Sequence, residues 1–386
     1  MHRVLNWIKH IAPFHTSKPQ VMLPVLGSIL LVVVLLLLPT GYEGAQIYQQ
    51  ADRCRAQVIA VDDSSIIDTG LVRSGEQRCT LELETGLFAG QTVTGINLLS
   101  GSLETDKLFV PGDRALVVVS HSEGEILTVT MIDHFRIWQE AALGILFAVL
   151  LFGFAGIAGL RAILSFVLTI LMLWKVLVPC YLNGWNPVLT GLILVLLLTF
   201  VIILLVYGWE RRTAAAVSGA FLGILTAALT GAVFTNLFHI HGAVMPYAES
   251  LLYSGYQHLN LTQIFIASIF IGASGAVMDL AVDITSAVYE VVQKKPDITW
   301  REATRSGMNV GRAAMGTMTT TLLLAYSGGY IALLMVFMAQ GTPIAHILNY
   351  KYVSAEILDT MAGSLGLVTV APFTALTSGL LLTRKK

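Results

Sequence analysis

Charge is scarce in this 386-residue chain, because Asp, Glu, Lys and Arg together make up 12% of it. An average soluble domain has about 25% charged residues. The net charge is -1, and no basic tract exceeds the closing Arg384, Lys385 and Lys386. We therefore expect no nucleic-acid partner. With 55% hydrophobic residues, the chain is predicted to be an integral membrane protein whose first partner is the lipid bilayer.

Motifs of the common catalytic and phosphate-binding sites are also absent. The sequence contains no Gly-Lys-Ser or Gly-Lys-Thr, no Gly-x-Ser-x-Gly, no His-Glu-x-x-His and no Cys-x-x-Cys. His239, His241 and His258 fall in one predicted loop, but no cysteine accompanies them and their spacing fits no helical metal site. We therefore expect no enzyme, no cofactor and no metal site.

Long apolar runs fill most of the sequence. A run of about 20 residues can cross about 30 Å of hydrocarbon as a helix, and such runs occur at 21–39, 140–160, 162–182, 187–208, 213–236, 262–288, 309–338 and 356–382. They predict a polytopic α-helical protein with about eight transmembrane helices. The YSGGY sequence at 326–330 makes one run ambiguous, because it can divide that run into two short spans.

Positive charge favours a single span over 309–338. With one span there, the basic clusters all fall on one side of the membrane, which the positive-inside rule makes cytoplasmic. These clusters are Arg3, Lys9 and Lys18, then Arg161, Arg211 and Arg212, Lys294, Lys295, Arg301 and Arg305, and Arg384 to Lys386. Both termini are then cytoplasmic. The first run resembles a signal peptide, but an uncleaved anchor is favoured because the run is long and lacks an Ala-x-Ala site.

Residues 41–138 differ in character from the runs around them. Charge returns, and apolar residues alternate with polar ones in about five segments separated by Gly, Ser, Asp and Pro. We expect a small, barrel-like all-β domain outside the cytoplasm, either OB-like or a related partly open barrel. The predicted organisation is a cytoplasmic N-terminus and anchor helix at 1–40, this β-domain at 41–138 and a seven-helix domain at 139–386.

The three cysteines do not identify a redox site. Cys54 and Cys79 open two predicted strands of the outside domain, where the compartment permits a disulfide. The sequence leaves open whether those strands are neighbours, so a disulfide and two free thiols are both retained. Cys180 is expected to be a buried, small apolar residue near the end of a helix. The β-domain has no active-site signature and is expected to bind a protein partner or to control access to the helices.

The stretch GASGAVMDLAVDITSAVYEVV at 272–292 places acids in an apolar run. The residues within about 40° of Asp279 on a helical wheel are small or acidic, namely Gly272, Gly275, Asp283, Ser286 and Glu290. The opposite side carries Val277, Ile284 and Val288, which we expect to face lipid. An ionised Asp at mid-helix costs about 2.5–3.5 kcal/mol on insertion scales. We therefore expect Asp279 and Asp283 to point into the bundle, and Glu290 to lie in solvent near the cytoplasmic surface.

The next run supplies a partner for these acids. Arg312 enters the membrane from the cytoplasmic side, as the acids do, and one face of its helix is polar. This face consists of Asn309, Arg312, Gly316 and Thr319 or Thr320. We expect a polar seam between the two helices. The seam is either an ion pair that locks the helices together or an ion or proton site.

Glycines mark the last run as a second region of interest. Glu356 and Asp359 lie near its outer end, followed by Gly363, Gly366 and Pro372. Glycines in membrane helices permit close packing, and they also permit the broken helices that line transporter sites. The predicted packing or hinge glycines are Gly272, Gly275, Gly316, Gly328, Gly329, Gly363 and Gly366.

These stretches resemble the YibE/F-like family of bacterial membrane proteins. The resemblance rests on GAVMDLAV, SGMNVGRAAMGTMTTTLLLAYSGG and AEILDTMAGSLGLVTVAP, and it implies a cytoplasmic (inner) membrane location. Its motif positions are Asp279, Asn309, Gly311, Arg312, Gly316, Thr317, Tyr326 and Glu356. Ala313 and Thr320 depart from the family's usual Gly-Arg-Asp and Thr-Asn-Thr, and Asp283 replaces a small polar residue. We hypothesise that Asp283 compensates for the acid missing at 313. The resemblance implies no reaction.

Two functional hypotheses follow. The first is a transporter-like or channel-like bundle for an ion or small solute, with access controlled by the β-domain. Its predicted ion or solute site comprises Asp279, Asp283, Asn309, Arg312, Thr317, Thr320 and Glu356. The alternative is a noncatalytic membrane scaffold or assembly factor whose outside β-domain binds a partner. The sequence leaves the substrate and the oligomeric state open.

Overall fold

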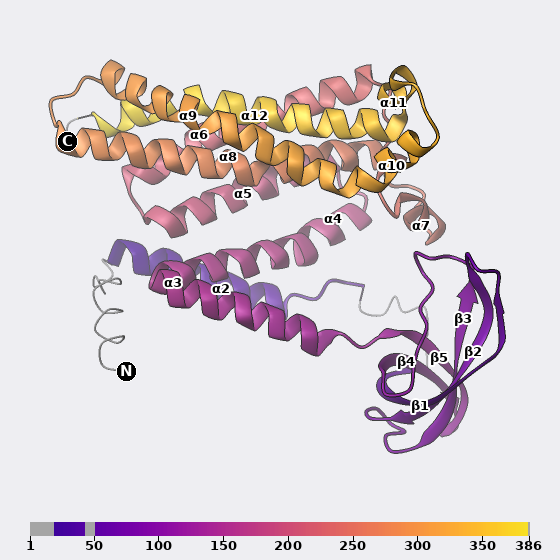
Figure 1. Ribbon diagram of the computed structural model, residues 1–386. Helices are drawn as coiled ribbons and strands as arrows, with labels where there is room; N and C mark the ends of the chain where they lie inside the picture. The colour runs from indigo at the N-terminus through magenta and orange to yellow at the C-terminus, as the bar shows by residue number, and fades with distance from the viewer. Residues whose placement is uncertain (1–18, 43–50, 385–386) are drawn as a thin grey trace, which may run out of the picture. The chain divides into compact units, whose positions relative to one another are not determined.

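The computed structural model describes residues 19–42 and 51–384. Two compact units divide the chain: residues 42–150 form one of them, and the flanking residues on both sides form the other. The first unit holds all the strands of the described residues, and the second holds most of the helices (Figure 1). Because the boundary lies at residue 150, the β-unit also includes the start of the long helix that follows the strands.

The β-unit is a closed five-stranded barrel in the order β1-β2-β3-β5-β4. All paired strands are antiparallel except β3 and β5, which run parallel. The strands are β1 (Ala51–Asp68), β2 (Arg73–Leu83), β3 (Thr92–Ser100), β4 (Arg114–Ser122) and β5 (Glu125–His134). The predicted small all-β, barrel-like domain is thus confirmed, and five barrel strands agree with an OB-like arrangement.

Period-2 alternation fills the barrel interior. Along β2, Cys79, Leu81 and Leu83 are buried while Arg78 and Glu82 are exposed, as expected for a strand with one face in a core. The polar interior residues Gln77 and Asn97 are hydrogen-bonded. Gln77 Nε2 donates to Phe109 O (3.0 Å), Phe109 N donates back to Gln77 Oε1 (3.0 Å), and Asn97 Nδ2 donates to Lys107 O (2.6 Å). These bonds fix the β3–β4 loop to the barrel wall.

The disulfide allowed by the sequence is not formed, because Cys54 and Cys79 are free thiols. Cys54 is opposite Val117 of β4, whereas Cys79 is opposite Val61 of β1. The position facing Cys79 is therefore seven residues along β1 from Cys54, which is about 23 Å of strand. A disulfide requires Cα atoms within about 7 Å. Burial raises the pKa of each thiol to about 11.

The other unit is helical, and its helices are those of a multi-pass membrane protein. Six helical stretches of the described residues are long and apolar enough to cross a membrane, and a shorter apolar helix covers Met22–Leu37. The elements in chain order are α2 (Pro19–Leu37), α3 (Ile137–Met172), η1 (Leu173–Leu177), α4 (Val178–Leu182), α5 (Pro187–Tyr207), α6 (Arg211–Leu237), η2 (Gly242–Val244), α7 (Ala248–Tyr253), α8 (Leu261–Lys294), α9 (Trp300–Ser327), η3 (Gly328–Tyr330), α10 (Ile331–Ala339), α11 (Ile344–Asn349) and α12 (Lys351–Leu382).

Capping residues explain where three of these helices begin. The Asn186 side chain accepts a hydrogen bond from Leu189 N at the start of α5, and Asn260 accepts one from Gln263 N at the start of α8, both at 3.0 Å. Thr299 and Glu302 form a capping box at the start of α9. The predicted start at 309 is therefore nine residues late, because the first turns of α9 are polar and carry no apolar run.

Two predicted spans lie in one helical stretch. The runs at 140–160 and 162–182 both fall within Ile137–Leu182, a stretch of 46 residues. The break is at Gly156, whose φ of 56° and ψ of -127° are not helical, and not near Arg161 as the runs predict. Glycine tolerates this positive φ, since it has no Cβ. The YSGGY sequence does not divide its run either, because α9, the short 3₁₀ turn η3 and α10 form one stretch over Trp300–Ala339.

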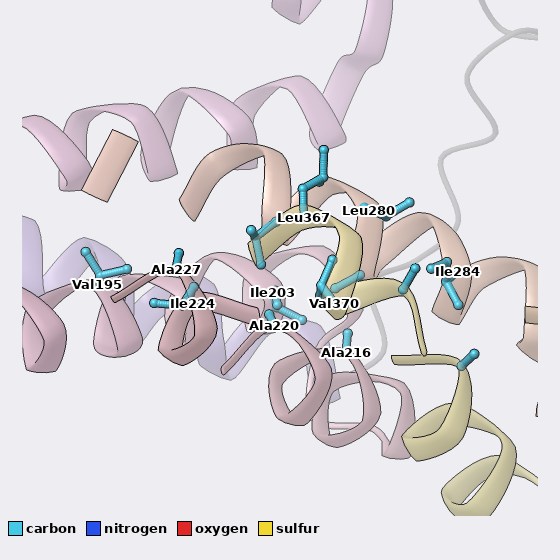
Figure 2. Close-up of a cluster of buried hydrophobic side chains, with 14 of the residues drawn as sticks. Val195, Ile203, Ala216, Ala220, Ile224, Ala227, Leu280, Ile284, Leu367 and Val370 are labelled. Atoms are coloured by element: carbon cyan, nitrogen blue, oxygen red, sulfur yellow. The ribbon is translucent and has the colours of Figure 1, made fainter. Parts of the chain in front are cut away.

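Small residues let the central helices approach closely. A cluster of buried alanines and branched apolar residues lies where α5, α6, α8, α9 and α12 meet (Figure 2). A Cβ at Gly366 of α12 would lie 2.8 Å from Ala227 Cβ and 2.9 Å from Gly223 O of α6. A Cβ at Gly219 would lie 2.7 Å from the Thr374 Cα. These distances are too short for any side chain, so glycine sets the α6–α12 spacing.

We expect Gly219→Ala to destabilise the protein. The added methyl group meets the Thr374 backbone, which cannot move without shifting α12, and overpacking of this kind costs about 1–3 kcal/mol. The measurement is the Tm of the purified full-length protein in detergent. Gly27→Ala in α2 is the control, since nothing lies within 4 Å of its Cβ position. Equal Tm values for the two variants would show that the α6–α12 contact is looser than described.

We expect Cys54 and Cys79 to resist alkylation in the folded protein. With a pKa of about 11, only about one thiol in 10⁴ is a thiolate at pH 7, and both side chains are buried. The measurement is the mass of a Cys180→Ser chain after maleimide treatment at pH 7. No label is expected before denaturation and two labels after it. A chain that takes up label only when reductant accompanies the denaturant would reveal a disulfide instead.

Candidate functional site

The acids of α8 lie on the opposite side from the one predicted. Asp279 and Asp283 are exposed in the single chain, whereas Val277, Ile284 and Val288, predicted to face lipid, are fully buried. The inward orientation of the acids is therefore wrong for the isolated chain. The reason is that the facing helices supply the small residues: a Cβ at Gly223 would lie 3.0 Å from Val277.

In the contact between α8 and α9, the facing helix again supplies the small residues and α8 supplies the bulky ones. A Cβ at Gly307 of α9 would lie 2.8 Å from Val288 Cγ2, and one at Gly311 would lie 3.2 Å from Ile284 Cδ1. Bulky α8 residues thus fill spaces over α9 glycines. Of the glycines on the acidic side of α8, Gly275 has nothing within 4 Å of its Cβ position, whereas a Cβ at Gly272 would lie 2.5 Å from Tyr326 Oη of α9.

The polar residues of α9 are exposed as well. Asn309, Arg312, Gly316, Thr317 and Thr320 all lie on its exposed side. The threonine hydroxyls donate within the helix, from Thr317 to Ala314 O (3.0 Å) and from Thr320 to Gly316 O (3.2 Å). Across residues 19–42 and 51–384, no ion pair joins Arg312 to an acid. The predicted pairing is therefore absent within the single chain.

These exposed residues border one another across the α8–α9 contact. On a helical wheel Arg312 and Tyr326 lie within about 40° of each other, and so do Gly272, Asp279 and Asp283. Tyr326 Oη lies over Gly272, where a Cβ would be 2.5 Å away. The Arg312 side of α9 thus adjoins the acidic side of α8. We call this surface the α8–α9 polar face, comprising Gly272, Gly275, Asp279, Asp283, Asn309, Arg312, Gly316, Thr317 and Thr320.

The end of this face that lies beside the last residue of α5 carries a cluster that the sequence reasoning missed. Tyr207, the last residue of α5, has its Oη 2.6 Å from Val282 O and 2.7 Å from Ser286 Oγ. The Arg212 guanidinium stacks on Tyr207 (5.0 Å) and Tyr289 (4.3 Å), and it pairs with Glu210. Glu290 is exposed and lies 4.0 Å from Lys294 Nζ, in accordance with a solvated position. The only sequence signal for this cluster was the basic pair after α5.

A second polar group lies at the other end of the bundle, between α9, η3 and α12. Glu356 and Asp359 of α12 interact with Tyr326 of α9 and with Tyr330 of η3. Among the described residues, Tyr326 Oη, Glu356 Oε1 and Asp359 Oδ1 are buried without a hydrogen-bond partner. We call these four residues the Glu356–Asp359 cluster. The i, i+3 spacing of the acids indicated their shared face and the family resemblance marked Tyr326, but no pattern indicated Tyr330.

The other predicted site residues are placed as follows. Gly363 packs on Ala273 (3.1 Å from a built Cβ) and Gly366 packs on α6, while open space surrounds Gly316, Gly328 and Gly329. Gly328 and Gly329 form part of the 3₁₀ turn that positions Tyr330. In the described part of the chain, no group of three or more His, Cys, Asp or Glu side chains is arranged to hold a metal ion. His239, His241 and His258 are therefore not part of such a group.

The cluster and the polar face are joined through Tyr326. Its hydroxyl contacts the glycine that begins the polar face and interacts electrostatically with both carboxylates. Polar groups therefore follow one another from Glu356 and Asp359, through Tyr326, to Asp279 and Asp283. An unpaired, buried carboxylate oxygen is costly, and a proton, a water molecule or a cation bound there removes that cost. The arrangement can therefore bind a positively charged ligand.

Comparison with known proteins gives one result that fits this structure. The model of one family, described as YibE/F-like protein, matches residues 143–384. No curated protein and no solved structure matches the chain. The matched range contains α5 to α12, and so both the α8–α9 polar face and the Glu356–Asp359 cluster. Because the match covers more than half of the sequence, the chain belongs to the YibE/F-like family.

Proposed function

We propose that this protein moves protons or a small monovalent cation across the bacterial cytoplasmic membrane, and that the Glu356–Asp359 cluster is the exchange site. The observation that carries the proposal is the set of three buried oxygens without a partner: Tyr326 Oη, Glu356 Oε1 and Asp359 Oδ1. Ionisable groups inside a membrane protein are costly, and they mark ion pathways and proton relays. Two carboxylates and two phenols provide acceptors for one cation or sites for one shared proton.

The polar face supplies the rest of the path in this proposal. Asp279 lies seven residues beyond Gly272, about 10 Å along α8, and Asp283 lies one turn further. The Tyr207 and Ser286 hydroxyls follow, 2.7 Å apart, and Arg212 and Glu210 complete the series at the cytoplasmic end. Acidic and hydroxyl groups thus recur along α8 at intervals that water molecules can bridge.

The orientation we propose places both termini in the cytoplasm and the barrel outside, with eight spans. Gly156 supports the span count, because the segments on either side of it, 137–155 and 157–182, each contain enough residues for about 28 Å of helix or more. Arg161 supports the sidedness. Its Nη1 donates to Leu205 O (3.0 Å) and Val206 O (3.3 Å), so it lies beside the end of α5 that precedes the basic pair Arg211 and Arg212.

The scaffold hypothesis has one observation in its favour, which is a groove on the barrel. The groove has a volume of about 310 Å³ and is lined by both apolar and charged side chains, among them Leu71, Leu103, Asp68, Arg73 and Lys107. Protein–protein interfaces combine apolar and polar side chains in this way. In the transport proposal, the same groove binds a protein that controls access to the helices. In the scaffold hypothesis, binding that protein is the only function.

We expect Asp359→Asn and Glu356→Gln to abolish transport while leaving the fold intact. Each amide keeps the shape of the acid but cannot release a proton or neutralise a cation. The measurement is acidification of liposomes that contain the full-length protein and a trapped pH dye, with Na⁺ or K⁺ gradients as separate arms. Flux at the level of protein-free liposomes is expected for each variant.

Asp297→Asn, in the exposed loop between α8 and α9, is the matched control and should transport as the parent does. Tm values in detergent verify that each variant is folded. Parental flux in both cluster variants would remove the exchange site from the proposal. Absence of flux from the parent under every gradient, together with a protein captured on the barrel groove, would favour the scaffold.

A further inference from the structure

The charges of the α8–α9 polar face form no ion pair or hydrogen bond among the described residues, although Asp283 has an electrostatic interaction with Tyr207. Asp279, Asp283 and Arg312 are exposed, and none of them is in an ion pair or hydrogen bond with a residue of 19–42 or 51–384. Asp283 is eleven residues from the end of α8 and Arg312 is twelve from the start of α9, so both lie about 16–18 Å inside the ends of their helices. Exposure of each charge to lipid at the centre of a span costs about 2.5–3.5 kcal/mol.

The exposed sides of α5 and of most of α12 are apolar. The exposed side chains of α12 include Met361, Leu365 and Val368, and those of α5 include Ile193 and Leu197. Such side chains are suited to lipid. The polar face differs from them in both charge and size of side chain, which indicates that a protein surface covers it.

Glycines give this face the shape of a helix interface. Nothing lies within 4 Å of the Cβ positions at Gly275 and Gly316, which are on the polar face and on either side of the α8–α9 contact. Small residues at the surface of a membrane helix allow another helix to approach closely, whereas they gain little from lipid. Open glycines beside unpaired charges therefore mark a docking surface, and not a surface left for solvent.

We propose that two copies of this chain associate through the α8–α9 polar face, with Arg312 of each copy paired to Asp283 of the other. A twofold axis along the membrane normal places each residue of one copy at the same depth as that residue in the other copy. Two opposite charges can therefore pair across the axis only if they lie at equal depth on the surface of each chain. Asp283 and Arg312 meet this condition, because Ile284 lies over Gly311 in the α8–α9 contact. The face is thus complementary to itself, and association forms two ion pairs.

The test uses charge reversal in the full-length protein. Asp283→Arg and Arg312→Asp each place like charges in both contacts of a homodimer, and like-charge contacts cost several kcal/mol. We expect the wild type to be a dimer by native mass spectrometry from nanodiscs, and each variant to dissociate at least about tenfold more readily. Lys351→Asp, in the first turn of α12 and therefore on neither helix of the face, is the control and should remain dimeric.

Mixing the two variants separates pairing between copies from pairing within one copy. In a heterodimer of the two variants, the Asp283→Arg chain has arginine at both positions and the Arg312→Asp chain has aspartate at both. Each contact then joins an arginine to an aspartate, so both ion pairs are restored. We expect co-expressed chains with different tags to purify together, although neither variant dimerises alone. Pairing within one chain gives no such rescue.

Three results would overturn the proposal. The first is a monomeric wild type, whether alone or bound to an unrelated protein at this face. The second is that the single variants are as dimeric as the wild type. The third is that folded variants fail to form the mixed dimer. If a reversed charge prevents membrane insertion, Asp283→Asn replaces it. That variant keeps the side-chain shape and loses the ion pair, so it should dimerise less strongly than the wild type, and unchanged dimerisation would count against the proposal.

Discussion

Close contact between glycines and bulky apolar residues in the α6–α8–α9–α12 bundle is the constraint on which the remaining structure depends. Glycines of α6, α9 and α12 leave room for Val277, Ile284 and Val288 of α8 and for the neighbouring backbone. Dispersion contacts of this kind replace the hydrophobic effect as the attraction between helices in lipid. Since the bulky side of α8 is used for packing, its small and acidic side is left outside.

The same packing explains the two polar regions. Tyr326 can reach Gly272 because the helices are close, and this contact joins the Glu356–Asp359 cluster to the acids of α8. The proposed transport function and the proposed dimer then concern one continuous set of polar groups. Two copies joined at the α8–α9 polar face would enclose Asp279 and Asp283 between proteins, where water can be retained and lipid is excluded. A single chain leaves that path open on one side.

Several elements were predictable from local patterns alone. Apolar runs located the long apolar helices, because each residue contributes its own cost or gain on transfer into hydrocarbon. Alternation located the barrel strands for a similar reason, since one face of each strand is in a core. The start of α9 and the break at Gly156 were missed, because a capping box and a single positive φ leave apolar content unchanged. The sequence also left the cysteines open, since strand order decides which residues face each other.

The sequence by itself determined the class of the protein, its family, the barrel between helices and the acidic side of α8 as a coherent surface. The family follows from the resemblance of three motifs, and the other features follow from composition and periodicity, all of which depend only on the order of residues. The direction in which that acidic side points was decided by the tertiary structure alone. A helix with small and acidic residues on one side and branched residues on the other can bury either side, and the glycines of its neighbours select the branched one.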